Sequence, residues 1–444
     1  MSRLRVAVPG IAIVVVLALL FGLGRAFSNQ LVVAPPVSPM PQPSITGDSG
    51  GNPDPTRPGA DSRPAQNLSG VLDGAAFEIR VPADWNGTLL LYAHGLRNTS
   101  EARGAPREVS AFLSDKAEEL MLEKGYAVAG SAYRQDGWAV AEGIDDMRAL
   151  FEHFKAVVGQ PQTTLMAGFS MGSVIALSEL ERNELYDGVL AGCPVGAGTP
   201  RTFDAMLALS LAYDAVYGWP SNWGTPADVR DDLDFERDVQ PTLLQQYGAA
   251  DGPAKFELIR ILAGIPKGAE WWKRVWGFAT ETRADLERRS GGPVGQNLDH
   301  HYAVSPKERN HLNEIGINDQ LIDSTISRMS ALRIAPGAGR PYAEKYAEFS
   351  GLISRPVLLL GTRTDALIPP ASSQAYSETV ERAQTQQWLA NAWTSGKGHC
   401  QFSPLQIYTA VEALNTWVQI GTKPEKFPTS QGFITMKPPV WFQP

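Results

Sequence analysis

Residues 163–172 read TTLMAGFSMG, and this stretch decides the fold of the chain. The first five residues are typical of a buried strand, and the apolar residues from Ser173 onward have helical spacing. Between them, Gly168, Ser170 and Gly172 form a Gly-x-Ser-x-Gly turn, which is typical of a serine nucleophile on a tight strand-to-helix turn. The flanking glycines have no Cβ, so the neighbouring strand and helix can approach the turn. The stretch therefore predicts that the Ser170 hydroxyl projects from a sheet edge beside the N-terminus of a helix.

An acidic residue and a histidine follow in the order that such a serine requires. Asp365 lies four residues past the glycine that ends the apolar strand 357–361, and His399 lies in the glycine-flanked segment 396–400. A carboxylate on the turn after a strand can reach histidine Nδ1 and hold its tautomer. We therefore expect Asp365 to be the catalytic acid residue and His399 the base. An Asx turn or a helix N-cap before Pro370 is the alternative role for Asp365.

The other histidines of interest have a structural explanation. His94 precedes Gly95 directly after an apolar strand, and we expect it to tie that loop down by hydrogen bonds rather than to act as the base. The adjacent pair His300-His301 could bind a metal, but no ligand set with a known spacing accompanies it. We therefore expect packing roles for this pair, and neither a metal nor a cofactor in the site.

These motifs resemble the α/β-hydrolase superfamily in order and spacing, over residues 67–193 and 356–420. The resemblance implies an α/β fold, with an eight-stranded type of mostly parallel sheet covered by helices on both faces. It implies a Ser-Asp-His triad and an oxyanion hole formed by the backbone N–H groups of Leu96 and Met171. It also implies a carboxylesterase-like enzyme that cleaves esters through an acyl-enzyme intermediate. An amidase or peptidase would use the same groups, and a non-catalytic binding protein on this fold is the least favoured alternative.

The chain has two cysteines, Cys193 and Cys400. The His399-Cys400 pair resembles tannases and feruloyl esterases, in which this cysteine is bonded to one beside the nucleophile. Here Phe169 precedes Ser170, but Cys193 ends the next strand and faces the region of the histidine loop. We expect either a Cys193–Cys400 disulfide that holds His399 or two buried free thiols.

The chain outside the site alternates strands and helices, except over residues 194–355. That stretch has helical patches and is too long for a loop, so we expect a helical cap inserted after the sixth strand, with residues 67–193 and 356–444 forming the catalytic domain. The tryptophans of the cap suggest either an apolar or aromatic substrate group or simple packing. The tail after Gly421 is proline-rich, and we expect it to wrap the surface. The expected strands are 76–81, 88–93, 126–132, 163–169, 188–193, 356–361 and 387–392, and the expected helices are 107–124, 143–158, 173–182 and 405–418.

The N-terminal region differs in character from the rest. A basic segment precedes an uncharged, largely aliphatic run at residues 6–24, which is the pattern of a secretory signal. We expect residues 1–26 to be a cleaved signal peptide or a retained membrane anchor, and a core helix is the third alternative. Residues 27–66 are rich in Pro, Gly and Ser and are expected to form a disordered linker. The protein is therefore expected outside the cytoplasm, either secreted or anchored to the outer face of the cytoplasmic membrane.

The composition limits the range of partners. The net charge of −8 argues against nucleic acid, which is bound through clustered Lys and Arg. A content of 43% hydrophobic residues is ample for a large core. We expect a small-molecule ester or amide as the substrate, with membrane attachment through residues 6–24 as a second interaction.

Overall fold

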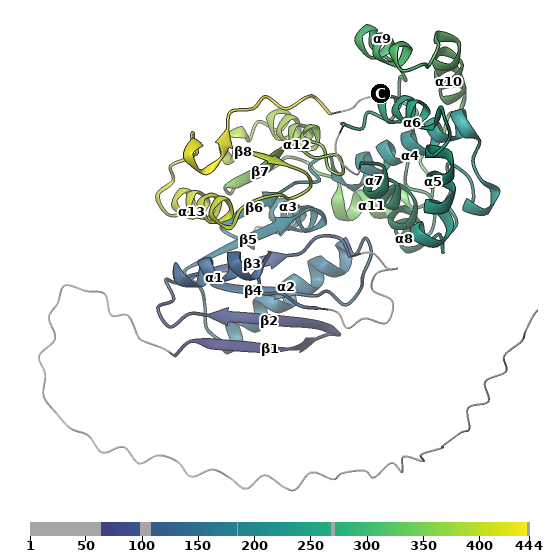
Figure 1. Ribbon diagram of the computed structural model, residues 1–444. Coiled ribbons are helices and arrows are strands. Elements are labelled where there is room, and N and C mark those ends of the chain that lie inside the picture. The colour runs from purple at the N-terminus through teal and green to yellow at the C-terminus, as the bar shows by residue number, and fades with distance from the viewer. Residues whose placement is uncertain (1–63, 98–107, 184, 268–270, 442–444) are drawn as a thin grey trace, which may run out of the picture. The chain divides into compact units, whose positions relative to one another are not determined.

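A nine-stranded sheet runs through the part of the chain that the computed structural model describes, residues 64–97, 108–183, 185–267 and 271–441 (Figure 1). Neighbouring strands follow the order β1-β2-β4-β3-β5-β6-β7-β8-β9. The six strands from β4 to β8 in this order are parallel, and β1, β2 and β9 pair antiparallel at the two edges. The strands are β1 (Gln66–Leu72), β2 (Ala75–Val81), β3 (Thr88–Ala93), β4 (Ala127–Ser131), β5 (Thr163–Phe169), β6 (Gly188–Gly192), β7 (Val357–Thr364), β8 (Leu389–Lys397) and β9 (Phe433–Ile434).

Helices cover both faces of the sheet. Every residue of β3, β4, β5 and β6 is therefore buried. Alternate side chains of β3 enter two separate cores: Leu89 and Leu91 pack on one side, and Leu90 and Tyr92 on the other. Helices α2, α3 and α12 cover the first side, and α1 and α13 the second. Their bounds are α1 (Asp115–Glu123), α2 (Val140–Val157), α3 (Met171–Asn183), α12 (Pro370–Arg382) and α13 (Pro404–Ile420).

The expected fold class is confirmed, with differences at the edges of the sheet. Strand β1 was not expected, because most of its residues are exposed and its apolar alternation is weak. The ninth strand, β9, lies in the proline-rich tail. It has only two residues and pairs with β8. The helix expected from residue 107 begins at Asp115, because the Ser114 side chain caps it by accepting from the Ala117 N–H.

The insertion between β6 and β7 is helical, as expected. Helix α4 is its longest element and packs against α6, α10 and α11 (Figure 1). Two of the cap tryptophans, Trp223 and Trp276, are fully buried around Tyr213, with ring centroids 5.6 and 5.1 Å from the tyrosine ring. They therefore form the core of the cap, which supports the packing explanation. The cap helices are α4 (Gly198–Tyr217), α5 (Gln240–Tyr247), α6 (Gly252–Leu262), α7 (Trp271–Gly277), α8 (Arg283–Ser290), α9 (Pro306–Glu314), α10 (Asp319–Ala331) and α11 (Arg340–Ala347).

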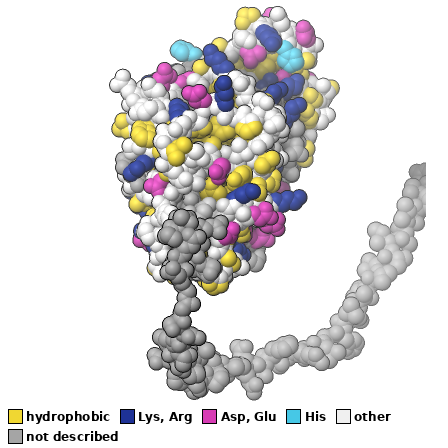
Figure 2. Space-filling view, turned by 90° about the vertical axis from the view of Figure 1, so that its left-hand side faces the viewer, with side chains coloured by type: hydrophobic (Ala, Val, Ile, Leu, Met, Phe, Trp, Pro, Cys, Tyr) yellow, Lys and Arg dark blue, Asp and Glu magenta, His cyan; other side chains and the backbone are white. Residues whose placement is uncertain are grey.

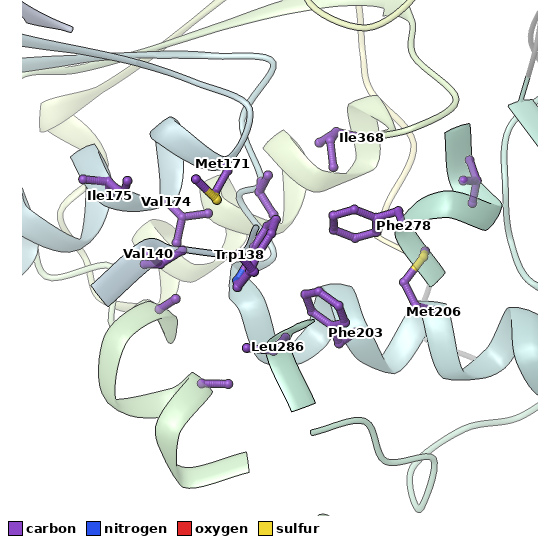
Figure 3. Close-up of a cluster of buried hydrophobic side chains, with 14 of the residues drawn as sticks. Trp138, Val140, Met171, Val174, Ile175, Phe203, Met206, Phe278, Leu286 and Ile368 are labelled. Atoms are coloured by element: carbon purple, nitrogen blue, oxygen red, sulfur yellow. The ribbon is translucent and has the colours of Figure 1, made fainter. Parts of the chain in front are cut away.

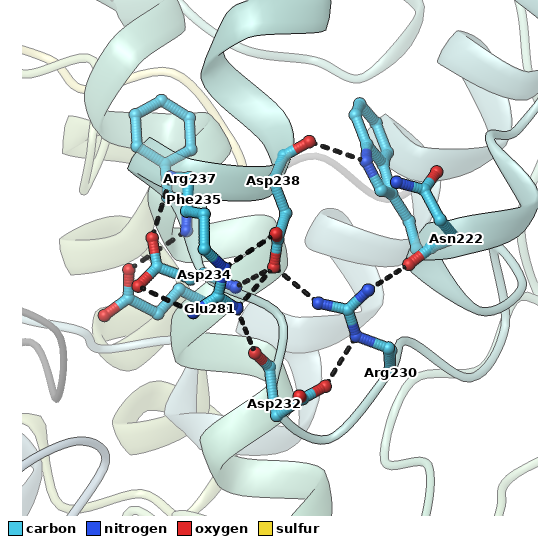
Figure 4. Close-up of polar contacts among 9 residues, drawn as sticks. Asn222, Arg230, Asp232, Asp234, Phe235, Arg237, Asp238 and Glu281 are labelled. Carbon is cyan, nitrogen blue, oxygen red and sulfur yellow. Dashed lines mark hydrogen bonds and ion pairs between the residues drawn. The ribbon is translucent and has the colours of Figure 1, made fainter.

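A polar network closes the cap loop that leads into α5 (Figure 4). The Asp238 carboxylate accepts from Arg230 and Arg237, and its backbone carbonyl accepts from the Trp223 indole at 3.0 Å. The hydrogen bond from Arg237 lowers the pKa of Asp238 to about 2, so this carboxylate is charged at neutral pH. The network thus fixes the loop around a buried tryptophan.

The predicted N-terminal segment and most of the predicted linker, residues 1–63, lie outside the described residues. Within the described ranges, no helix is both long and apolar enough to cross a bilayer. On the face shown in Figure 2, basic and acidic side chains are interspersed with apolar ones, so the net charge is not concentrated there.

Candidate active site

Ser170 lies at the junction of β5 and α3, with a left-handed backbone φ of 55°. Its N–H donates to the Gly192 carbonyl of the neighbouring strand at 3.0 Å. A Cβ at Gly168 would collide with the carbonyl oxygen of Gly172, and a Cβ at Gly172 would collide with that of Ala93. Both glycines are therefore required by close backbone approach, as the sequence predicts.

The structure brings the three predicted triad residues together. His399 Nε2 lies 2.8 Å from Ser170 Oγ, and His399 Nδ1 lies 2.7 Å from Asp365 Oδ2. Because an ionised carboxylate can only accept, Nδ1 carries the proton and Nε2 is free to accept from the serine hydroxyl. The other Asp365 oxygen accepts from the N–H groups of Leu367 and Ile368, both at 2.9 Å. The carboxylate is 3% exposed, and these bonds fix it against the histidine.

A serine on the elbow between a parallel strand and a helix, followed along the chain by an aspartate and then a histidine, is the arrangement of the α/β-hydrolase fold. The chain has this fold.

Comparisons with known proteins show distant similarities to this chain. It matches no protein-family model. The o-phthalyl amidase of Xanthobacter agilis is 22% identical over 431 residues, covering 82% of this chain and 89% of the relative. The solved acylaminoacyl peptidase of Pyrococcus horikoshii is 10% identical, with a TM-score of 0.40, and covers 83% of this chain. This chain spans 43% of that peptidase's length. An esterase from Aspergillus oryzae is 14% identical, with a TM-score of 0.37, and covers 81% of this chain and 80% of its own.

The loop after β3 lies against Ser170. A Cβ added to Gly95 would lie 3.2 Å from the Ser170 Cβ, so this glycine allows the loop to approach. Leu96 is the next residue of the loop, and Met171 is the first residue of α3, where backbone N–H groups have no helical partner. The predicted oxyanion donors therefore belong to two segments that lie beside Ser170: the loop after β3 and the start of α3.

His94 is held within its loop. Its Nδ1 lies 2.6 Å from the Gly95 carbonyl oxygen, and its ring stacks on Tyr133 with centroids 3.9 Å apart. Burial, together with the nearby charge of Arg97, lowers the pKa of His94 to about 4. The imidazole is therefore neutral at pH 7, and these contacts fit the structural role expected for His94.

Cys193 and Cys400 form a disulfide, with Cα atoms 5.2 Å apart. The N–H of Cys193, which follows β6, donates to the Leu360 carbonyl of β7 at 2.8 Å. Cys400 Sγ lies 3.7 Å from His399 Nε2. The bond therefore links the sheet directly to the loop that carries the histidine.

The cysteines and His399 also form the one described group of three residues whose atoms could gather around a metal. The two sulfurs are bonded to each other, and both His399 nitrogens face triad partners, so these residues do not fit a metal site. The His300-His301 pair has no such group around it among the described residues.

Aromatic side chains from the cap lie close to the turn that carries Ser170 and Met171 (Figure 3). Trp138 packs edge-on against Phe203 and Phe278, with ring centroids 5.3 and 5.4 Å away. Met171 and Ile368 belong to the same buried cluster. None of these three aromatic residues was predicted from the sequence as a site residue. Trp138 follows the turn after β4, at the sheet edge where α/β proteins bind ligands, and this position could have indicated it.

The cap is attached to the catalytic domain through buried charges. Asp285 of α8 accepts from the Trp138 N–H at 2.7 Å and pairs with Arg289 at 2.7 Å. Arg289 also pairs with Glu142 of α2 at 2.8 Å and donates to the Asp136 carbonyl. These contacts fix Trp138 between the cap and the turn that carries Ser170.

Proposed function

We propose that this protein is a serine hydrolase that cleaves a carboxylic ester through an acyl-enzyme intermediate. The observation that carries the proposal is the hydrogen-bond chain from Asp365 through His399 to Ser170, with bonds of 2.7 and 2.8 Å. A nucleophile, a base and a group that orients the base at these distances form the arrangement required for acyl transfer.

In the proposed reaction, His399 Nε2 takes the Ser170 proton while Oγ attacks the substrate carbonyl carbon. Asp365 holds the resulting imidazolium. The N–H groups of Leu96 and Met171 are proposed to stabilise the oxyanion, assisted by the N-terminus of α3. His399 then protonates the leaving alcohol. The same histidine activates water, which releases the acid and restores Ser170.

Cleavage of an amide is the second candidate, since the same groups can protonate an amine leaving group. It is supported by the o-phthalyl amidase of Xanthobacter agilis, which matches the chain over most of both lengths. Rates on an ester and an anilide that share one acyl group would separate the two candidates.

The test is labelling with a small fluorophosphonate, which reacts with an activated serine. We expect the wild-type protein to be labelled at Ser170, and Ser170→Ala to lose labelling and at least about 10⁴-fold in kcat. Ser178→Ala is the matched control, because Ser178 is buried on the same helix and its hydroxyl has no hydrogen-bond partner among the described residues. Labelling of Ser170→Ala, or an unlabelled folded wild type, would contradict the proposal. The latter result would favour a binding protein.

We also propose that the hydrolase works outside the cytoplasm. The Cys193–Cys400 disulfide supports this location, because such bonds persist in oxidising compartments. The signal-like residues 6–24 support it independently. Mass spectrometry of the protein isolated from its native cells tests the proposal, since an intact N-terminus and two free thiols in a cytoplasmic fraction would refute it.

A further inference from the structure

An apolar cavity of about 210 Å³ lies between the cap and the segment that follows Asp365. Its walls come from α4, the end of α6 and the residues after it, α7, residues 366–372, and the C-terminal residues 439–441. The mechanism proposed above assigns no role to this cavity.

The C-terminal strap, defined as residues 435–441, forms one wall of the cavity. It leaves β9, passes α12 and ends beside the cap (Figure 1). Trp441 is 8% exposed and packs against Ala197, Ala371 and Ala375, and the Arg201 guanidinium lies 5.9 Å from the centre of its ring. The strap thus places a large, buried aromatic ring against both the cap and the catalytic domain.

Two residues of the cavity wall are hydrogen-bonded to Asp365 of the triad. Leu367 and Ile368 line the cavity, and their N–H groups are the two that donate to Asp365 Oδ1. Ile368 also lies in the buried cluster with Met171, the residue next to the nucleophile (Figure 3). A group bound in the cavity would therefore lie on the cap side of the catalytic acid.

The size and chemistry of the cavity limit what it can hold. A dry apolar cavity of about 150 Å³ holds a benzene ring, so about 210 Å³ accommodates one ring with a substituent. The described lining residues carry no charge. One of them, Thr202, is 4% exposed, and its hydroxyl has no hydrogen-bond partner among the described residues. A buried hydroxyl without a partner favours a ligand that supplies one.

We propose that this cavity binds a neutral, monocyclic aromatic group of the substrate, with Trp441 as the wall that limits its size and Thr202 as a hydrogen-bond partner for a ring substituent. The proposal rests on the serine hydrolase function and identifies its substrate class. The ring is attached either to the acyl carbon or to the leaving group.

The test compares kcat/KM within two ester pairs: methyl benzoate against methyl acetate, and benzyl acetate against ethyl acetate. Ala205→Phe places a ring in the cavity, and we expect it to lower one of these two ratios at least about tenfold. Trp441→Ala enlarges the cavity, and we expect it to raise the rate on the corresponding naphthyl ester relative to the phenyl ester. Thr202→Val should reduce any preference for a hydroxyl-substituted ring.

Ala331→Phe is the matched control, because Ala331 is exposed at the end of α10. Rates are normalised to the fraction of molecules labelled by a small fluorophosphonate, so that unfolded variants do not enter the comparison. If the wild type is labelled, but Ala205→Phe changes neither ester ratio and Trp441→Ala does not change the naphthyl-to-phenyl ratio, the cavity proposal is wrong while the hydrolase function stands. An unlabelled wild type overturns both.

Discussion

Removal of the Cys193–Cys400 bond should affect both stability and turnover. The two cysteines are 207 positions apart, and closing a loop of that length removes about 5 kcal/mol of conformational entropy from the unfolded chain at 25 °C. Measured effects are typically smaller, so we expect the free energy of unfolding to fall by about 2–5 kcal/mol. Because Cys400 follows His399, a freed loop would also shift the base. A displacement of about 1 Å can cost about 100-fold in rate.

The assay follows urea denaturation and ester hydrolysis with and without a reductant, for the wild type and for the double variant Cys193→Ala/Cys400→Ala. The chain has no other cysteine, so the reductant acts only on this bond and the double variant is its control. We expect the reduced wild type to match the double variant in both measurements. A wild type that titrates two thiols after reduction, yet keeps its unfolding free energy and kcat/KM, would refute the reasoning.

Three further predictions follow from the site. Gly95→Ala should lower kcat/KM by about tenfold or more with an unchanged thermal midpoint, because the new Cβ lies 3.2 Å from the Ser170 Cβ; equal activity would contradict the close approach. The pKa of His94 is about 4 in the folded protein and about 6.5 in the unfolded chain, so the unfolded chain binds a proton first as the pH is lowered. The free energy of unfolding should therefore fall by up to about 3 kcal/mol as the pH is lowered from about 6.5 to about 4. Urea denaturation of His94→Gln should lack this slope, and the same slope in the variant would refute its origin. Asp285→Ala should lower the free energy of unfolding by about 1–3 kcal/mol, because the buried Trp138 N–H loses its acceptor and Arg289 keeps only Glu142 as an ion-pair partner; an unchanged free energy of unfolding on urea denaturation would show that the cap is not held there.

The parts of the fold with strong local patterns were predictable from the sequence. Strands β3 and β5 are continuous apolar runs, and such runs have one stable location, inside a covered parallel sheet. Edge strand β1 has mostly exposed residues, and β9 has only two, so neither has a pattern that distinguishes it from a loop. The start of α1 depended on a single capping serine within a longer helical pattern.

The aromatic residues that meet in the cap and around the cavity could not be predicted from the sequence. Phe203, Phe278 and Trp441 come from separate segments, and each is one of many aromatic residues in the chain. Their positions result from helices that pack to fill irregular space, for which no period exists in the sequence. The structure also showed that Trp223 and Trp276 fill the interior of the cap rather than line this cavity.

The sequence by itself determined the elbow around Ser170, the α/β class and the candidates Asp365 and His399, because backbone sterics and strand burial are local requirements. Only the tertiary structure decided that these side chains meet, because Ser170 and His399 are 229 positions apart and their distance depends on how the whole sheet assembles. It likewise paired the two cysteines and placed the strap against the cap. Contacts of that kind are set by long-range packing, which no short stretch of sequence contains.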